Sequence, residues 1–284
     1  MQKTLFPRVR PRRLRLNETI RDLVSETNIN KSKLIQPVFV SDTLKQKEEI
    51  VTMPGQYLYS KDDVLSEIDE LTDLGINTIA LFPNIESDLK DISGSEALKE
   101  DNFICSIVRQ IKERFPKLVI ITDVALDPYT PSGHDGIILD GKIDNDLTLE
   151  ALSKMSINLA SSGADILAPS DMMDGRIGKI RDSLEKNNHK DIILLSYAAK
   201  YASNFYGPFR DAVGSKQTEG ISKKTYQMDS KNLKEAYKEI LLDINEGADI
   251  VMVKPAMPYL DVINDLHQEI NVPIFAYQVS GEYS

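Results

Sequence analysis

The strongest constraint on the fold is an alternation of short apolar runs with amphipathic helical patterns. The apolar runs predict strands at residues 34–40, 78–82, 118–123, 166–169, 192–197, 250–254 and 274–279. The helical patterns between them cover residues 61–74, 102–115, 148–162, 175–187, 231–246 and 259–270. Strands that alternate with helices are typical of βαβ units and a parallel sheet.

The connections favour a barrel over a doubly wound sheet. Three predicted helices close on Gly-Ile-Asn or Gly-Ala-Asp before the next strand, at residues 75–77, 163–165 and 247–249. Glycine there supplies the left-handed cap that turns the chain back into the sheet. No Gly-x-Gly-x-x-Gly motif follows a predicted strand, which weakens a dinucleotide-binding interpretation. We predict an α/β fold, a (β/α)8 TIM barrel, which typically takes about 250 residues.

The two ends of the chain depart from this pattern. Residues 1–16 contain five arginines with Pro7 and Pro11 among them, which predicts an extended N-terminal arm. The arm is either a solvated tail or a segment that wraps a neighbouring subunit. Asn17 is expected to cap a short helix at 18–26. We assign residues 17–284 to the barrel.

Only seven strands are predicted, so we expect the last strand and helix unit to be missing from this chain. A barrel truncated in this way would leave open edges at 34–40 and 274–279.

Composition excludes several classes of function. The net charge of −10 argues against nucleic acid as the main partner. The single cysteine, Cys105, excludes a disulfide framework and a cysteine-rich zinc site. We find neither a signal-peptide pattern nor an apolar run long enough to cross a membrane, so we expect a cytoplasmic protein without a membrane partner.

Two lysines follow apolar strand patterns. The segment 249–255 reads Asp-Ile-Val-Met-Val-Lys-Pro, and Pro255 should end the strand at Lys254. Lys200 follows the strand at 192–197. Barrel enzymes keep their chemistry at such strand ends, and an amine in apolar surroundings loses solvation, which lowers its pKa. Either lysine alone would more often be an ordinary surface residue.

Polar turns follow the neighbouring strands. Asp123, Asp127, His134 and Asp135 follow the third strand and could bind a divalent cation or transfer protons, or they form a solvated turn. The loop at 214–224, which contains Lys216 and Lys223, could be a lid or a disordered loop. Arg210 and a lysine of this loop suit a substrate carboxylate.

Several long strings resemble the δ-aminolevulinic acid dehydratase (porphobilinogen synthase) family, nearly from end to end. They are residues 10–16, 39–55, 167–176, 196–212, 225–228, 252–255 and 277–283. The resemblance implies a hydro-lyase that condenses two molecules of 5-aminolevulinate to porphobilinogen, with loss of two waters, through lysine Schiff bases in tetrapyrrole (haem) biosynthesis.

The resemblance also implies roles for individual residues. Lys254 matches the principal Schiff-base lysine and Lys200 the second, while Asp123 and Ser170 match polar residues around the reacting amines. The residues expected to bind the substrates are Arg210, Lys223, Ser280, Tyr206 and Tyr277.

The metal expectations rest on the same resemblance. Ala125, Asp127 and Asp135 stand where zinc-type members carry cysteines, so zinc is not expected, and the two aspartates become candidates for an active-site cation. Glu239 matches a ligand of an allosteric Mg²⁺. The family further implies a homo-oligomer, an octamer.

Two other functions compete with this one. A class I aldolase also needs a strand-end lysine, but neither a second lysine nor the string at 277–283. A barrel that lost its last unit could instead survive as a non-catalytic assembly partner.

Overall fold

The structure is a computed structural model that describes residues 8–215 and 220–283. The chain divides into two compact units, residues 1–34 and residues 35–284. The predicted boundary after residue 16 remains a prediction. No helix among the described residues is both long and apolar enough to span a bilayer.

The N-terminal unit is more helical than expected. It contains η1 (Pro11–Arg15), α1 (Glu18–Leu23) and η2 (Lys31–Lys33). The prediction of an extended segment is wrong at residues 11–15, because Pro11 begins a 3-10 helix, a position where the missing N–H costs nothing. Asn17 caps α1 as predicted, by accepting a hydrogen bond from the Ile20 N–H, but the helix ends at Leu23 rather than at residue 26.

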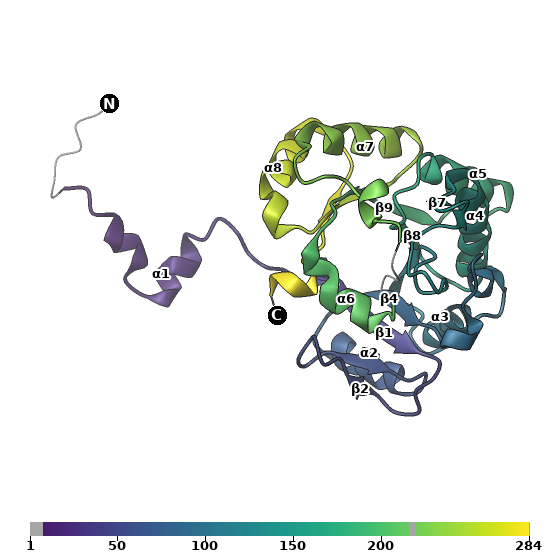
Figure 1. Ribbon diagram of the computed structural model, residues 1–284. Helices are drawn as coiled ribbons and strands as arrows, with labels where there is room; N and C mark the ends of the chain where they lie inside the picture. The colour runs from purple at the N-terminus through teal and green to yellow at the C-terminus, as the bar shows by residue number, and fades with distance from the viewer. Residues whose placement is uncertain (1–7, 216–219, 284) are drawn as a thin grey trace. The chain divides into compact units, whose positions relative to one another are not determined.

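The predicted strands are confirmed in the second unit. The strands are β1 (Gln36–Ser41), β4 (Thr78–Asn84), β5 (Val119–Val124), β8 (Ile166–Pro169), β9 (Ile193–Lys200), β10 (Ile250–Lys254) and β11 (Ile274–Ala276). They form parallel neighbours in the order β11-β10-β9-β8-β5-β4-β1. In Figure 1 the strands β1, β4, β8 and β9 curve along one side of a centre and most of the barrel helices lie outside them, which agrees with the barrel class.

All six predicted helices of the barrel are confirmed, with ends that shift by up to three residues. They are α2 (Asp63–Asp73), α3 (Phe103–Arg114), α4 (Asn145–Ser161), α5 (Arg176–Lys186), α7 (Leu233–Asn245) and α8 (Leu260–Glu269). Gly75, Gly163 and Gly247 have φ values of 86°, 103° and 106°, as the predicted left-handed caps require. The short α6 (Gly207–Ala212) and the 3-10 turns, which include η5 (Asn204–Tyr206), η6 (Lys223–Thr225) and η8 (Ser280–Glu282), were not predicted.

One expected open edge is covered. The three-residue strand β3 (Tyr57–Tyr59) runs parallel to β1, with Phe39 opposite Leu58, and β2 (Glu48–Glu49) pairs antiparallel with β3. The prediction of an open edge at 34–40 is therefore wrong, because a strand this short has too little periodicity to be found in the sequence. At the other end, β11 is the outermost strand of the sheet among the described residues. A separate hairpin joins β6 (Ile138–Leu139) to β7 (Lys142–Ile143).

Successive strand residues face different parts of the core. Val38 and Val40 of β1 pack in a large cluster with helix residues such as Ile68, whereas Phe39 belongs to a second cluster of strand side chains. Phe39 stacks on Phe82 with ring centroids 5.6 Å apart. The second cluster fills the inside of the barrel, as alternation across each strand requires.

A buried arginine ties the helix layer to the strands. Arg176, the first residue of α5, is 2% exposed and donates to both carboxylate oxygens of Asp243 on α7, at 3.2 and 2.9 Å. It also donates to the Ser196 hydroxyl of β9, and its Nε lies 3.8 Å from Asp171. These contacts hold α5, α7 and the segment after β8 together.

We expect Arg176→Leu to lower the free energy of unfolding by about 3–5 kcal/mol, because Asp171 and Asp243 would remain buried without their cation. Urea denaturation followed by circular dichroism measures the change. Lys179→Ala on the same helix is the control, since its ion pair with Glu150 is exposed and should contribute less than about 1 kcal/mol. Equal effects of the two substitutions would contradict this view of Arg176.

Candidate active site

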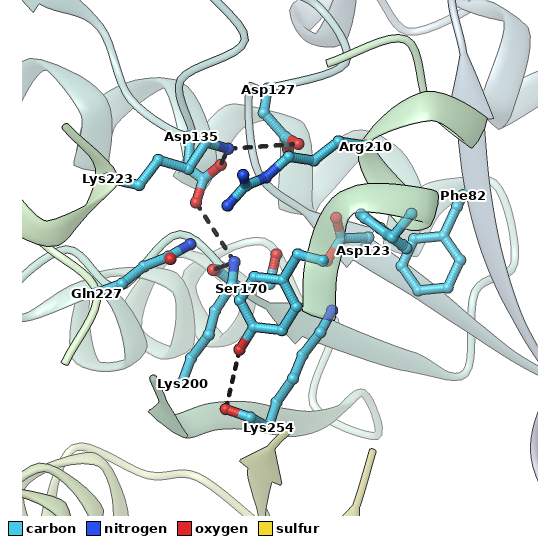
Figure 2. A pocket seen from close by; sticks show the side chains of 12 residues that line it. Phe82, Asp123, Asp127, Asp135, Ser170, Lys200, Arg210, Lys223, Gln227 and Lys254 are labelled. Atoms are coloured by element: carbon cyan, nitrogen blue, oxygen red, sulfur yellow. Dashed lines mark hydrogen bonds and ion pairs between the residues drawn. The ribbon is translucent and has the colours of Figure 1, made fainter. Parts of the chain in front are cut away.

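One pocket collects side chains from the carboxyl ends of five strands (Figure 2). Its lining residues are Phe82, Asp123, Asp127, Asp135, Ser170, Lys200, Tyr206, Phe209, Arg210, Lys223, Gln227 and Lys254. Strand β4 supplies Phe82, β5 supplies Asp123, β9 ends at Lys200 and β10 ends at Lys254, while Ser170 follows β8 directly. The location is the one that barrel enzymes use for chemistry.

The two lysines are placed by the register of the sheet. β9 and β10 are neighbouring parallel strands, and Lys200 is the direct partner of Lys254 in their ladder. Directly opposite residues point to the same face of a sheet, so both amines enter the same pocket. Both side chains are buried, with 7% and 3% exposed. The structure thus brings together the two lysines that the sequence analysis singled out.

Aromatic rings surround the Lys254 amine. Its Nζ lies 4.1 Å from the ring centroid of Tyr277, 4.5 Å from that of Phe209, and 5.2 and 5.3 Å from those of Tyr197 and Tyr206. Burial, together with the nearby Lys200 charge, lowers the pKa of Lys254 to about 7. The ring faces attract an ammonium group and oppose part of this shift. A large share of the Lys254 amine is therefore neutral near neutral pH.

Lys200 is held by polar groups instead. Its Nζ donates a short hydrogen bond to the Ser170 carbonyl oxygen and a second one, of 3.3 Å, to Asp135. The two lysines thus have different environments, one aromatic and one polar. Such a difference allows the two amines to take different roles in the chemistry.

Asp123 faces both amines from β5. Burial and the charge of Asp127 raise the pKa of Asp123 to about 7, while Lys200, a hydrogen bond from Ser170 and Lys254 work in the opposite direction. Its Oδ1 is buried and has no hydrogen-bond partner among the described residues. A carboxyl group with this pKa can both give and accept a proton near neutral pH.

A pair of carboxylates, Asp127 and Asp135, faces Lys223. The Lys223 Nζ lies 2.8 Å from Asp135 and 3.9 Å from Asp127 (Figure 2). Burial, together with the charge of Asp135, raises the pKa of Asp127. Burial also works to raise the pKa of Asp135, but the Lys200 and Lys223 ammonium groups outweigh it and hold that pKa below its usual range. Burial works to lower the pKa of Lys223, and the two carboxylates overcome it.

Three of the remaining predicted residues differ in how they relate to the pocket. Arg210 lines the pocket from α6, with its guanidinium 5.9 Å from the Tyr206 ring. The Tyr206 hydroxyl donates to the backbone carbonyls of Tyr201 and Lys254, so only its ring faces the pocket. Ser280 is buried at the start of η8, outside the set of pocket-lining residues.

Two further positions were predicted to have a role. Glu239 lies on α7, outside the set of residues that line it. Lys216 lies outside the described residues.

Sequence reasoning gave no role to several residues of the site. Phe82, Phe209 and Gln227 line the pocket, and Tyr197 borders Lys254. Phe82 lies near the end of its strand, a position that could have marked it as a candidate. Tyr197 likewise ends the strand predicted at 192–197, whereas neither residue type nor spacing singled out Phe209 and Gln227.

The carboxylates of the pocket do not fit a divalent cation. Ala125 supplies no ligand, and both Asp127 and Asp135 already face the Lys223 ammonium group. No cluster of three or more His, Cys, Asp or Glu side chains suited to a metal occurs within residues 8–215 and 220–283. Magnesium takes six oxygen ligands in near-octahedral geometry and would have to displace the lysine.

Comparisons with known proteins agree with this site. A family model described as delta-aminolevulinic acid dehydratase matches residues 8–284. The delta-aminolevulinic acid dehydratase of Bradyrhizobium diazoefficiens is 49% identical over 276 residues, which cover 97% of this chain and 78% of that protein. That of Methanothermus sociabilis is 51% identical over 279 residues, or 98% of this chain and 86% of that protein.

A solved structure extends the agreement to three dimensions. It is the delta-aminolevulinic acid dehydratase (porphobilinogen synthase) of Toxoplasma gondii ME49 in complex with the reaction product porphobilinogen. The sequence identity is 46% and the TM-score 0.93, and the match covers 97% of this chain and 78% of that one. The chain therefore belongs to the delta-aminolevulinic acid dehydratase family.

Proposed function

We propose that Lys254 and Lys200 carry the Schiff bases through which this chain condenses two molecules of 5-aminolevulinate to porphobilinogen. The chain is a porphobilinogen synthase, a hydro-lyase of tetrapyrrole biosynthesis, and the reaction releases two waters. The observation that supports the residue assignment is the pair of buried lysines at directly opposite positions of two strand ends.

Lys254 forms the first imine. Its amine attacks the ketone carbon of one substrate, and the carbonyl oxygen leaves as water. The protonated imine then draws electrons from the neighbouring carbon, which loses a proton and becomes a nucleophile. The lowered pKa of Lys254 supplies the neutral amine that this step needs.

Lys200 and Asp123 serve the later steps. An imine on Lys200 activates the second substrate, so that one C–C bond and one C–N bond join the two molecules. Asp123, with its pKa near 7, accepts and returns the protons, and the Ser170 side chain orients it. Both lysines are released as free amines when the product forms.

Basic and polar residues bind the substrate carboxylates. Arg210 and Lys223 both line the pocket, and they attract the carboxylate of one substrate. Ser280, Tyr277 and the Tyr206 ring are assigned to the other substrate. The ring of Tyr277 is the aromatic group nearest to the Lys254 amine among those described.

A regulatory Mg²⁺ is proposed at Glu239. Burial and the neighbouring Asp243, Asp174 and Glu235 raise the pKa of Glu239, against the effect of Arg176. Mg²⁺ is commonly held by one or two carboxylates while it keeps several waters, so Glu239 could hold the ion without a cluster of three ligands. Arg176 connects this region to Asp171, the residue that follows Ser170 in the pocket wall.

We also propose that the chain acts in the cytoplasm as a homo-oligomer, an octamer in the family's pattern. The arginine-rich arm would then bind an acidic surface of a neighbouring subunit. Light scattering of the purified protein measures the assembly.

Borohydride reduction with 5-aminolevulinate should attach the mass of the reduced substrate to Lys254, because reduction makes an imine permanent. Intact-mass spectrometry and peptide mapping detect the adduct. Lys254→Met should abolish it, whereas Lys224→Met, at an exposed lysine, should leave it unchanged. A first adduct that maps to a residue other than Lys254 in the unsubstituted protein would overturn the assignment.

Imine formation should rise with pH through about 7 and then level off, because the neutral fraction of Lys254 grows as pH passes its lowered pKa. The initial rate of imine formation with 4-oxopentanoate, which lacks the substrate amine, measures this. Lys200→Met removes a neighbouring positive charge and should move the midpoint upward. A rate that keeps rising to about pH 10, as for an ordinary lysine, would contradict the lowered pKa.

Glu239→Gln should weaken Mg²⁺ binding at least tenfold and remove the response of activity to Mg²⁺, because one carboxylate ligand is lost. Calorimetric titration with Mg²⁺ and assays with and without a chelator give the two readouts. Glu269→Gln, an exposed carboxylate on α8, is the matched control. Unchanged Mg²⁺ affinity in Glu239→Gln would place the ion elsewhere.

A further inference from the structure

The charges of the pocket balance without a metal ion. Three basic groups, Lys200, Lys223 and Arg210, stand against the three carboxylates Asp123, Asp127 and Asp135. Lys254 is a fourth amine in a different, aromatic environment. A divalent cation added to this set would bring two positive charges beyond this balance.

Lys223 occupies the position between two of these carboxylates. Its side chain is 6% exposed and its Nζ contacts both Asp135 and Asp127. Lys200 contacts the other oxygen of Asp135, so this carboxylate lies between two ammonium groups (Figure 2). Such a buried, doubly paired carboxylate needs no further cation.

The backbone that carries Lys223 is anchored to the wall of the pocket. The Gln227 N–H donates to the Lys223 carbonyl at 2.8 Å. The Tyr226 hydroxyl lies 2.9 Å from the His134 Nδ1 and accepts a hydrogen bond of 3.4 Å from the Asp135 N–H. These bonds join the turn η6 to the loop that carries both aspartates, so the ammonium group is directed onto the carboxylate pair.

We propose that the Lys223 ammonium group is the resident cation of this pocket, in the place where Asp127 and Asp135 would otherwise hold a divalent ion. The proposal rests on the proposed function only in taking this pocket as the catalytic one. It has two consequences. The pocket binds no divalent ion while Lys223 is present, and removal of the ammonium group turns the carboxylate pair into a divalent-cation site.

The chemistry of the ligands supports the second consequence. Without Lys223, Asp127 loses its ion-pair partner and Asp135 keeps only Lys200, at 3.3 Å. Two carboxylates left in this way form an oxygen site for Mg²⁺ or Mn²⁺, and waters complete the coordination. Ala125, two residues before Asp127, is buried and supplies no ligand of its own. A neutral residue at position 223 would thus leave a buried charge that a divalent ion can compensate.

Mn²⁺ titration of the full chain, followed by electron paramagnetic resonance of the free ion, tests the proposal. Every protein carries Glu239→Gln, so that the site proposed on α7 does not contribute. This background should show no Mn²⁺ bound in the pocket. Adding Lys223→Met should create one site per chain with at least tenfold higher affinity, and adding Asp135→Asn to that variant should remove it.

Lys224→Met is the matched control, because Lys224 lies on the same turn but is exposed, and it should bind no Mn²⁺ in the pocket. Lys223→Arg keeps the charge and should likewise bind none. Circular dichroism melting adds a second readout, since Mn²⁺ should raise the melting temperature of Lys223→Met only.

Two results would overturn the proposal. One is a Mn²⁺ site in the background that disappears on Asp135→Asn, a comparison that holds even if Lys223→Met fails to fold. The other is a folded Lys223→Met protein with no gain in affinity. Metal titration needs no turnover, so a failure of imine trapping at Lys254 would be separate from either result.

Discussion

The register between β9 and β10 is the constraint on which the site depends. It places Lys200 directly beside Lys254, and the parallel direction of the strands brings both amines out at the same edge of the sheet. A shift of one residue would turn one lysine toward the helix layer, because successive side chains point to opposite faces. The ladder is therefore a part of the catalytic apparatus and not only of the scaffold.

Charge compensation is the second principle of the pocket. Each buried carboxylate of the pocket has a basic side chain nearby, and four aromatic rings surround Lys254, the amine that must lose its proton. This separation lets a single cavity keep Asp135 ionised and Lys254 partly neutral. The same logic operates behind the pocket, where Arg176 neutralises Asp243 and faces Asp171.

Much of the fold could be predicted because strand and helix periodicities depend on neighbours in the sequence. The seven strands and six barrel helices were found in this way, and the strand-end rule identified both lysines. β3 was not predicted, because a strand of three residues is too short to show a hydrophobic periodicity. The contact of Lys223 with Asp135 could not be predicted, since it joins segments 88 residues apart through a turn whose direction only the folded chain determines. The aromatic surroundings of Lys254 likewise arise from four separate elements.

The Tyr206 hydroxyl links substrate recognition to the nucleophile. It bonds the backbone carbonyl of Lys254 and that of Tyr201, the residue after Lys200. Tyr206 directly precedes α6, the helix that carries Arg210. One short covalent segment therefore fixes Arg210 relative to the backbone at both lysines.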